Sequence, residues 1–304
     1  MTFAEVSVVI RTIGRPALLM RALESLAGCQ PRPAEVLVVD QSEERTSVAI
    51  IERVDLSGAR MIASQGRGRA LAMNEGFERA AHPLVLVVDD DCTVRPDWVA
   101  VAERVMREHP EGIVTGQVLP AGGDPRAVPS TMLLEQPRDY SGEIHYGVLF
   151  SGNMACPRDA VLELGGFDER IGPFAADCDF CYRWLRAGRG LRHVPELVVR
   201  HHHWRTPEEL GRLYVDYARS RGMFYAKHLR AGDWRMLRYL AGEYFAAFKS
   251  AVSRPFSDAP RWANESRGVF AGIPRGLWSG WRKFGSNSPT GRRFWRRFRR
   301  SAEP

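Results

Sequence analysis

The sequence predicts an α/β fold, a mostly parallel sheet with helices on both faces, followed by a helical C-terminal extension. Two patterns predict it. Short, wholly apolar strands alternate with amphipathic helices in the first part of the chain, as expected for a parallel sheet that is covered on both sides. Beyond residue 206 the strand patterns stop, and helical patterns with basic and aromatic faces follow. We therefore expect two domains, residues 1–205 and residues 206–304.

Four apolar strands before residue 110 are each followed by a helical pattern. The first helix shows the signals: Leu19, Leu23 and Leu26 fall on one face, Pro16 stands near its start and Gly28 ends it. The expected strands are 6–10, 35–40, 60–64 and 84–90, and the expected helices are 15–28, 47–54, 68–80 and 96–109.

The pattern loosens after residue 112. Residues 121–142 are rich in Gly and Pro and predict a long surface loop, of a length common in lids and binding loops. Thr206, Pro207 and Glu209 form a capping-box helix start, where we place the domain boundary. The other expected elements are strands at 149–156 and 197–203 and helices at 157–166 and 177–188.

The net charge of +7 resides in the C-terminus: residues 281–304 hold eight basic residues and one acidic residue, so the remainder is neutral. Charge therefore says nothing about the ligand of the main domain. No apolar run approaches the roughly 20 residues that span a bilayer, and the N-terminus lacks a secretory signal pattern. Five scattered cysteines, with a single CxxC at Cys178 and Cys181, favour reduced thiols in the cytoplasm over disulfides or a zinc site.

Three consecutive carboxylates, Asp89, Asp90 and Asp91, end an apolar strand. Ligands of such sheets bind beyond the carboxyl ends of the strands, where Arg11 and Asp40 also fall. Strand alternation puts Asp89 and Asp91 on one face, and two such carboxylates can hold a hard divalent cation and, through it, a diphosphate. Because mutual repulsion opposes ionising all three, we expect a positive charge in front of them. A solvated acidic turn is the alternative.

Asp177 heads an apolar helix face. Partial burial there raises the pKa of a carboxylate and suits it to accept a proton, whereas a plain N-cap aspartate is equally compatible with the pattern. Asp179 lies off this face and is expected to be structural. The apolar face comprises Phe180, Cys181, Trp184 and Leu185.

Histidines close the last predicted strand. His201 and His203 share one strand face, and neutral imidazoles beside carboxylates can complete a metal site or touch a phosphate. A polar strand end is the ordinary alternative for such a run.

The order and spacing of these motifs resembles the family 2 glycosyltransferases of the GT-A fold, over about residues 5–204. The segments that carry the resemblance are SVVIRTIGRPALLMRALESL, EVLVVDQS, GRALAMNEG, VVDDDCTVRPDWV, SGNM, GGFDER, ADCDFCYRWLRAG and VPELVVRHHH. The resemblance implies a non-processive, inverting, metal-dependent enzyme. It would transfer a hexosyl or deoxyhexosyl group from a UDP-, GDP- or dTDP-sugar to an acceptor hydroxyl.

The resemblance also implies residue roles. Asp177 would be the catalytic base, and Asp91 and His201 would hold Mg²⁺ or Mn²⁺ on the diphosphate. Asp40 would bind the nucleoside base, and Asp89 would lie near the ribose. The full set of expected donor-binding residues is Arg11, Thr12, Asp40, Arg69, Asn74, Asp89 and Asp90.

The chain departs from the family pattern in three places. RTIGRP, which contains Arg11 and Thr12, replaces the usual Pro-Thr start of the first loop. Met73 stands where the family often has an arginine that Arg69 can replace, and Ala176 stands where an acidic residue commonly precedes the base. None of these changes removes a residue that the chemistry requires.

The C-terminal segment GRRFWRRFRR, residues 291–300, predicts a helix lying in a membrane interface, with aromatic residues facing the lipid and arginines facing anionic headgroups. Segments 239–252 and 276–284 add aromatic surface. We expect peripheral attachment to the inner face of the plasma membrane and a lipid-linked or cell-envelope glycan acceptor, in polysaccharide biosynthesis. A disordered basic tail is the alternative. Nucleic acid is not expected as a partner, since no binding motif for it is present.

Two other function classes stay open. A sugar-phosphate nucleotidyltransferase also combines an α/β sheet with metal-binding aspartates, but it needs a Gly-rich basic loop after the first strand, and RTIGRP is a poor version of one. A non-catalytic glycan-binding relative is the second, and the presence of Asp91 and Asp177 opposes it. A processive synthase is disfavoured, because no transmembrane helix is predicted to form an export channel.

Overall fold

The computed structural model describes residues 2–122, 130–141, 148–172, 174–202, 205–253 and 260–285. The chain forms two compact units. The first comprises residues 1–169 and 180–204, and the second comprises residues 170–179 and 205–304. The division of the chain at residue 205 into two domains stays a prediction, and the grouping of residues 170–179 with the C-terminal helices was not indicated by any sequence signal.

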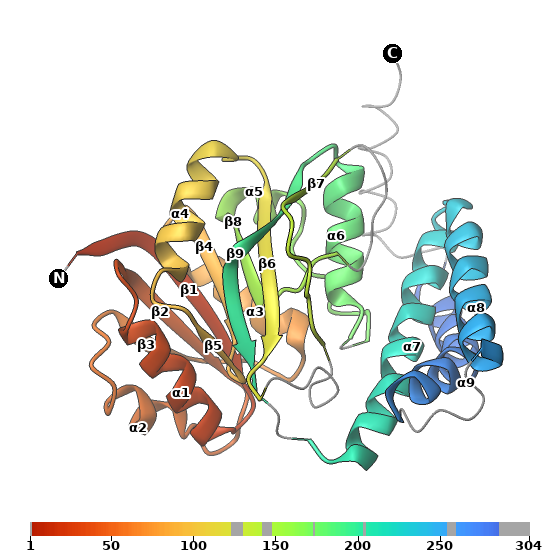
Figure 1. Cartoon of the computed structure of the whole chain (residues 1–304), viewed down its shortest axis with the longest axis horizontal. Helices are drawn as coiled ribbons and strands as arrows, with labels where there is room; N and C mark the ends of the chain where they lie inside the picture. The colour runs from red at the N-terminus through yellow and green to blue at the C-terminus, as the bar shows by residue number, and fades with distance from the viewer. Residues whose placement is uncertain are drawn as a thin grey trace. The chain divides into compact units, whose positions relative to one another are not determined.

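One mixed sheet organises the first unit (Figure 1). Its strands in the described part of the chain are β1 (Phe3–Thr12), β2 (Arg32–Asp40), β3 (Ala59–Ala63), β4 (Leu84–Asp89), β5 (Cys92–Val94), β6 (Ile113–Pro120), β7 (Arg138–Tyr140), β8 (Asn153–Pro157) and β9 (Leu191–His201). The strand order is β3-β2-β1-β4-β8-β6-β9-β5, and β7 pairs with β9. Strands β3, β2, β1 and β4 are parallel, as are β6 and β9, while β8 is antiparallel to β4 and β6. The predicted mostly parallel α/β core is thus confirmed.

Helices alternate with strands from β1 to β4, as predicted, whereas β4 and β5, and then β6, β7 and β8, follow one another without a helix between them among the described residues. The helices of the first unit are α1 (Pro16–Ala27), α2 (Ser47–Ile51), α3 (Arg69–Arg79), α4 (Trp98–Glu108), α5 (Arg158–Glu163) and α6 (Ala176–Arg186), the last of which begins in the second unit. Three strands were not predicted: β5 and β7 have only three residues each, and β6 interrupts its apolar pattern with Gly116 and Gln117. Residues 123–129 of the predicted loop lie outside the described residues.

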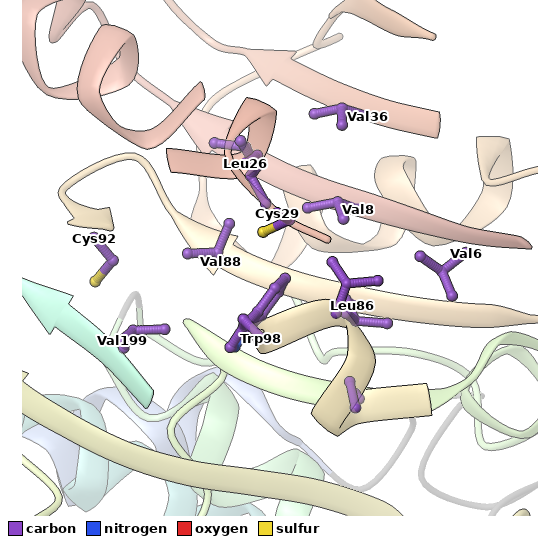
Figure 2. Close-up of a cluster of buried hydrophobic side chains, with 14 of the residues drawn as sticks. Val6, Val8, Leu26, Cys29, Val36, Leu86, Val88, Cys92, Trp98 and Val199 are labelled. Carbon is purple, nitrogen blue, oxygen red and sulfur yellow. The ribbon is translucent and has the colours of Figure 1, made fainter. Parts of the chain in front are cut away.

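Helices cover both faces of the sheet. On one face, Leu26 of α1 and Trp98 of α4 pack with Val8 of β1 and Val88 of β4 in a continuous buried cluster (Figure 2). On the other face, α3 approaches β1 so closely that a Cβ at Gly76 would lie 2.4 Å from Val9 Cγ1. Because side chains alternate along a strand, Val8 and Val9 serve opposite faces. Because both faces of the central strands are buried, polar side chains are expected mainly at the strand ends.

The second unit is helical in its described part, with α7 (Pro207–Arg230), α8 (Arg235–Ser253) and α9 (Pro260–Lys283). The predicted capping box is present: the Thr206 hydroxyl accepts from the Glu209 N–H at 3.3 Å, and the Glu209 carboxylate accepts from the Thr206 N–H at 2.8 Å. Among the helices that the structure describes, none is long and apolar enough to cross a membrane.

A row of glycines lets α9 lie against α7. Gly276 faces the backbone of Arg219, where an added Cβ would be 1.9 Å from the carbonyl oxygen and 2.8 Å from Gly222 Cα. The same close approach recurs along α9 at every fourth residue, namely Gly268, Gly272, Gly276 and Gly280. Their alignment fixes which side of α9 is buried and which side faces outward.

Candidate active site

The carboxyl ends of neighbouring parallel strands bring the predicted polar residues to one edge of the sheet. In the pairing of β1 with β4, Arg11 stands opposite Asp89, and their side chains form an ion pair of 2.5 Å between Arg11 NH2 and Asp89 Oδ1. A Cβ at Gly152 would lie 2.6 Å from Asp89 Oδ2, so only glycine there leaves room for this carboxylate.

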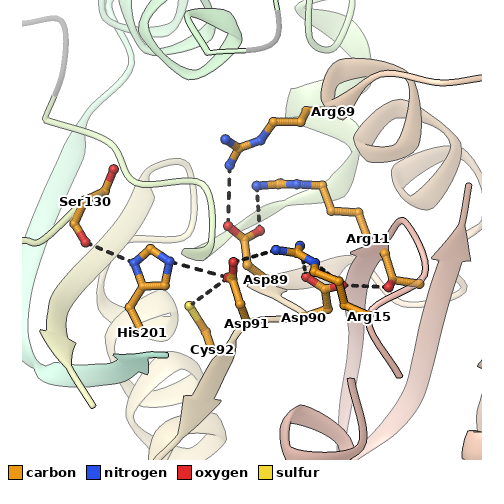
Figure 3. A network of polar contacts seen from close by, with 10 residues as sticks. Arg11, Arg15, Arg69, Asp89, Asp90, Asp91, Cys92, Ser130 and His201 are labelled. Atoms are coloured by element: carbon orange, nitrogen blue, oxygen red, sulfur yellow. Dashed lines mark hydrogen bonds and ion pairs between the residues drawn. The ribbon is translucent and has the colours of Figure 1, made fainter. Parts of the chain in front are cut away.

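Three arginines meet the three aspartates (Figure 3). Arg69, at the start of α3, lies 3.4 Å from the second oxygen of Asp89. Arg15, which precedes α1, bridges the two carboxylates that follow: its NH1 donates to Asp91 Oδ2 at 2.8 Å, and its Nε and NH2 donate to Asp90. The positive charge that the acidic run required is therefore supplied in part by the chain itself.

Asp90 lies with Asp91 in the turn that follows β4, so the strand alternation expected for these residues does not extend to it. It is fully buried, and besides Arg15 it accepts a hydrogen bond from the Thr12 hydroxyl at 2.6 Å. Burial raises the pKa of Asp90 to about 7, and the charges of Asp91 and Asp89 add to the effect, although Arg15 opposes it. In this structure Asp90 and Thr12 join the β1–α1 loop to the end of β4, and their contact with a donor stays a prediction.

Asp91 and His201 form the pair best suited to a metal ion. Asp91 Oδ1 lies 3.6 Å from His201 Nε2, and both residues are buried. The Nδ1–H of His201 donates to the Ser130 carbonyl at 3.0 Å, so in the neutral ring Nε2 carries the lone pair that faces Asp91. Burial alone lowers the pKa of His201, but the hydrogen bond to Asp91 and its charge outweigh burial and raise it.

Cys92 completes the cluster in which a metal can be held, since one ligand atom from each of Asp91, Cys92 and His201 lies within 4.8 Å of the others. Burial, followed by the nearby carboxylates, raises the pKa of the Cys92 thiol well above its usual value. A thiol that stays protonated is a poor ligand. The Asp91 carboxylate and the His201 imidazole nevertheless suit a divalent ion whose other ligands would come from a bound diphosphate.

Asp40 ends β2 at the same sheet edge but serves its own loop. Its Oδ1 accepts hydrogen bonds from the Ser42 backbone and hydroxyl at 2.8 and 2.6 Å, and its Oδ2 accepts one from the Ser47 hydroxyl at 2.5 Å. The carboxylate is fully buried. The structure thus shows Asp40 as the anchor of the β2–α2 loop, and its contact with a nucleoside base stays a prediction.

Asn74 on α3 is likewise engaged within the protein. Its side chain bonds both the N–H and the C=O of Phe167, at 2.8 and 3.0 Å, and donates to Glu169 at 2.8 Å. Gly166 has φ +62°, and a Cβ there would lie 2.4 Å from Asn74 Oδ1. The GGFDER motif is therefore a turn that Asn74 clamps, and a donor contact of Asn74 stays a prediction.

Asp177 lies in the first turn of α6, half-buried, in the residues assigned to the second unit. Two residues on, the buried Asp179 accepts hydrogen bonds from Lys227 Nζ at 2.6 Å and from His228 Nε2 at 2.9 Å. The structural role expected of Asp179 is thus observed, and the predicted apolar face that follows, Phe180 to Leu185, is buried. The role of Asp177 as base stays a prediction.

Sequence reasoning missed Arg15, Cys92 and Ser130. Arg15 was visible as part of RTIGRP, and the need of the acidic run for positive charge is the signal that could have directed attention to it. Ser130 acts through its backbone carbonyl, which no side-chain pattern reveals. His203 and the basic residues 286–304 lie outside the described residues.

Comparison with known proteins agrees with this architecture. Residues 7–165 match the model of the family described as Glycosyl transferase family 2. The chain is 28% identical over 212 residues to a pre-mycofactocin glycosyltransferase of Mycobacterium tuberculosis, covering 66% of this chain and 43% of that protein. It is 26% identical over 181 residues to a glucosyl-dolichyl phosphate glucuronosyltransferase of Haloferax volcanii, covering 55% and 57%. The chain thus spans about half the length of the curated relatives that it matches.

Solved structures show the same fold. A mannosyltransferase from Pyrobaculum calidifontis in complex with GDP-Man and Mn²⁺ superposes with a TM-score of 0.64 at 16% identity, covering 90% of this chain and 87% of that one. TarS of S. aureus in complex with UDP gives a TM-score of 0.54 at 16% identity, covering 89% and 91%. At this identity the likeness establishes the GT-A architecture, and residue roles must be argued from the site itself.

Proposed function

Since the chain belongs to glycosyl transferase family 2, we propose that it is a metal-dependent, inverting glycosyltransferase. It moves a hexosyl or deoxyhexosyl group from a nucleotide-diphosphate sugar to an acceptor hydroxyl. The observation that supports this most is the pairing of Asp91 with His201, whose Nε2 is oriented by the Ser130 carbonyl toward the carboxylate. That pair lies at the sheet edge where ligands of such folds bind.

Asp91 and His201 would hold Mn²⁺ or Mg²⁺, which when bound neutralises the diphosphate as it leaves. Arg15 holds Asp91 in place through one carboxylate oxygen, 2.8 Å from its NH1, while the oxygen near His201 also accepts from the Cys92 thiol at 3.8 Å. Arg69, whose side chain is about one third exposed, is the guanidinium best placed to meet a diphosphate oxygen, and Asp89 holds it at the site. The bidentate geometry of guanidinium groups suits phosphate binding.

Asp177 would take the proton of the acceptor hydroxyl while that oxygen attacks the anomeric carbon from the side opposite the diphosphate. The C–O bond to the acceptor forms as the bond to the diphosphate breaks, so one displacement inverts the anomeric configuration. A half-buried carboxylate at a helix start fits this role, because it is accessible to a substrate and still oriented by its helix.

For the acceptor we favour a lipid-linked or cell-envelope glycan, met at the inner face of the plasma membrane, where the protein would attach peripherally. The name of the Haloferax volcanii relative includes a dolichyl phosphate, a lipid carrier of this kind. The donor base, whether uracil, guanine or thymine, is a separate question. The solved relatives include complexes with GDP-Man and with UDP-GlcNAc.

The first test is a thermal-shift screen against UDP-, GDP- and dTDP-sugars, each with and without Mn²⁺. A donor that binds only the folded state raises the free energy of unfolding by mass action, by about 2.7 kcal/mol at one hundred times its Kd. The melting temperature rises as a result. We expect one nucleotide class to stabilise the protein, and to do so far better with Mn²⁺. If no nucleotide sugar stabilises it under either condition, the proposed function is wrong.

Two substitutions separate the roles. Asp91→Asn should abolish the Mn²⁺-dependent part of donor binding, whereas Asp177→Asn should leave donor binding intact and reduce transfer by several orders of magnitude. Asp159→Asn, on an exposed carboxylate of α5, is the matched control and should change neither. An Asp177→Asn variant that turns over normally would show that another group is the base.

A further inference from the structure

The exposed large hydrophobic side chains of this protein gather on two helices. Eight of the twelve found in the described residues lie on or beside α8 and α9, and the other four are scattered over the first unit. The eight are Trp234, Leu237, Phe245, Phe248, Val252, Phe270, Trp278 and Trp281, together called the aromatic face below. Monomeric soluble proteins rarely leave such a group without a binding role.

On α8 these side chains form one narrow stripe. Steps of three, four or eight residues return to about the same side of a helix. Such steps separate Trp234, Leu237, Phe245, Phe248 and Val252. Phe245 is 70% exposed and Phe248 is 60% exposed. The stripe runs the length of the helix, about 27 Å at 1.5 Å per residue.

On α9 the outward side is fixed by the glycines. Because Gly268, Gly272, Gly276 and Gly280 face α7, the opposite side of the helix carries Phe270, Trp278 and Trp281. The two helices adjoin at their aromatic residues, since the Phe270 ring lies 5.8 Å from the ring of Tyr244 on α8. The exposed aromatic residues of α9 therefore adjoin α8 at Phe270.

This surface is strongly basic. The exposed cationic side chains in its described part are Arg235, Arg238, Lys249, Arg267, Arg275 and Arg282. The single acidic residue of α8, Glu243, is bound by Arg221 of α7 at 2.9 Å. The single acidic residue of α9 is Glu265, and residues 266–283 of that helix contain none. Arginines also lie over the tryptophans, with Arg230 4.8 Å from the Trp281 ring centre and Arg282 5.8 Å from that of Trp278.

We propose that the aromatic face binds an anionic lipid bilayer, with α8 and α9 lying in the plane of the interface. Tryptophan and phenylalanine insert at the boundary between headgroups and acyl chains, and flanking Arg and Lys meet the negative lipid headgroups. A second copy of this chain is a poor occupant, because pairing the same face on both subunits would place like charges together. The inference rests on the proposed function only in that a lipid-linked acceptor would be found at such a surface.

The test is flotation of the full-length protein with vesicles of phosphatidylcholine, alone or with about 30% phosphatidylglycerol, at low and high salt. The wild type should bind the anionic vesicles, and high salt should weaken the binding. Phe245→Ser with Phe248→Ser should reduce partitioning at least about tenfold, because two aromatic side chains lose their apolar burial. Both side chains are exposed, so this variant should fold normally.

Two further variants isolate the cause. Arg238→Glu with Lys249→Glu should remove the preference for anionic vesicles. Phe3→Ser with Leu133→Ser makes the same change at exposed hydrophobic positions of the first unit and should bind like the wild type. Replacing the arginines of residues 292–300 by serine tests the terminal segment separately, and it should leave most of the binding in place.

The proposal is overturned if the Phe245/Phe248 variant binds vesicles as the wild type does, if charge-neutral vesicles bind equally well, or if binding depends only on residues 292–300. A concentration-dependent dimer that the Phe245/Phe248 variant abolishes, without vesicle binding by the wild type, would assign the face to self-association instead. The thermal-shift screen with nucleotide sugars is independent of lipid. Failure of that screen would therefore refute the proposed function without affecting the bilayer proposal. Failure of the vesicle experiment would refute the bilayer proposal without affecting the proposed function.

Discussion

The close contact between α7 and α9 predicts how one added methyl group changes the stability of the protein. In Gly276→Ala, the new Cβ would lie 1.9 Å from the Arg219 carbonyl oxygen and 2.8 Å from Gly222 Cα. Both atoms belong to the backbone of α7, so no side chain can rotate out of the way. The helices must move apart by about 1 Å or more to restore ordinary contact distances.

Two effects of opposite sign set the magnitude. Alanine is a better helix former than glycine by about 0.8–1.0 kcal/mol, which favours the variant. Overpacking costs about 1–3 kcal/mol, and the upper part of that range applies here because the clash is with backbone and the neighbouring glycines keep the two helices close along their length. We expect Gly276→Ala to lower the free energy of unfolding by about 1–2 kcal/mol.

Gly242→Ala on α8 is the matched control. Gly242 is an exposed helical glycine, and a Cβ there meets nothing within 4 Å. The same substitution should therefore raise stability, by up to about 1 kcal/mol. Urea denaturation followed by circular dichroism measures both variants. If Gly276→Ala is as stable as Gly242→Ala, the close backbone packing of α7 and α9 is not as described.

Other predictions concern hydrogen bonds within each unit. Burial alone raises the pKa of Glu35, but hydrogen bonds from Ser7, the Ala81 N–H and Arg60 outweigh burial and lower it. The stabilisation is present above the unfolded pKa of about 4.3 and is lost as the pH falls through the folded pKa, so Glu35→Gln should cost about 1–2 kcal/mol at pH 7 and progressively less as the pH is lowered below about 4 in urea titrations. Thr206→Ala removes half of the α7 capping box and should cost about 1 kcal/mol in thermal unfolding, and equal melting temperatures would contradict the cap. Asn74→Ala leaves the Phe167 backbone without partners and should cost about 1–3 kcal/mol; increased cleavage of residues 165–169 in limited proteolysis would report the loosened turn.

The sheet could be predicted where burial on both faces left a simple pattern. Strands β1, β2 and β4 each contain a short apolar run, and each was located to within a few residues. Strand β6 was missed because its sequence IVTGQVLP mixes polar and apolar residues, although most of it is buried. Its partners β8 and β9 supply that burial from distant parts of the chain, and a local pattern contains no information about them.

The candidate site follows the same division. The position of the acidic run at a strand end could be predicted, because parallel strands gather their carboxyl ends at one edge. The partners could not: Arg15 meets Asp90 across 75 residues and Ser130 meets His201 across 71. Asp40 and Asn74 show a second limit of sequence-based prediction. Residue types that bind ligands also stabilise the loops around a site, and the structure shows both side chains hydrogen-bonded within the protein.

The matching of three guanidinium groups to three carboxyl groups at the sheet edge has a consequence for how ligands arrive. Charges that are closely paired exert less attraction over distance than isolated ones, so capture of a sugar nucleotide with its cation should respond only weakly to ionic strength. The outward side of α8 and α9 carries an excess of basic residues over acidic ones and should behave in the opposite way. We therefore expect added sodium chloride to weaken vesicle binding while donor binding at the sheet edge changes little, so a salt titration can distinguish the two events.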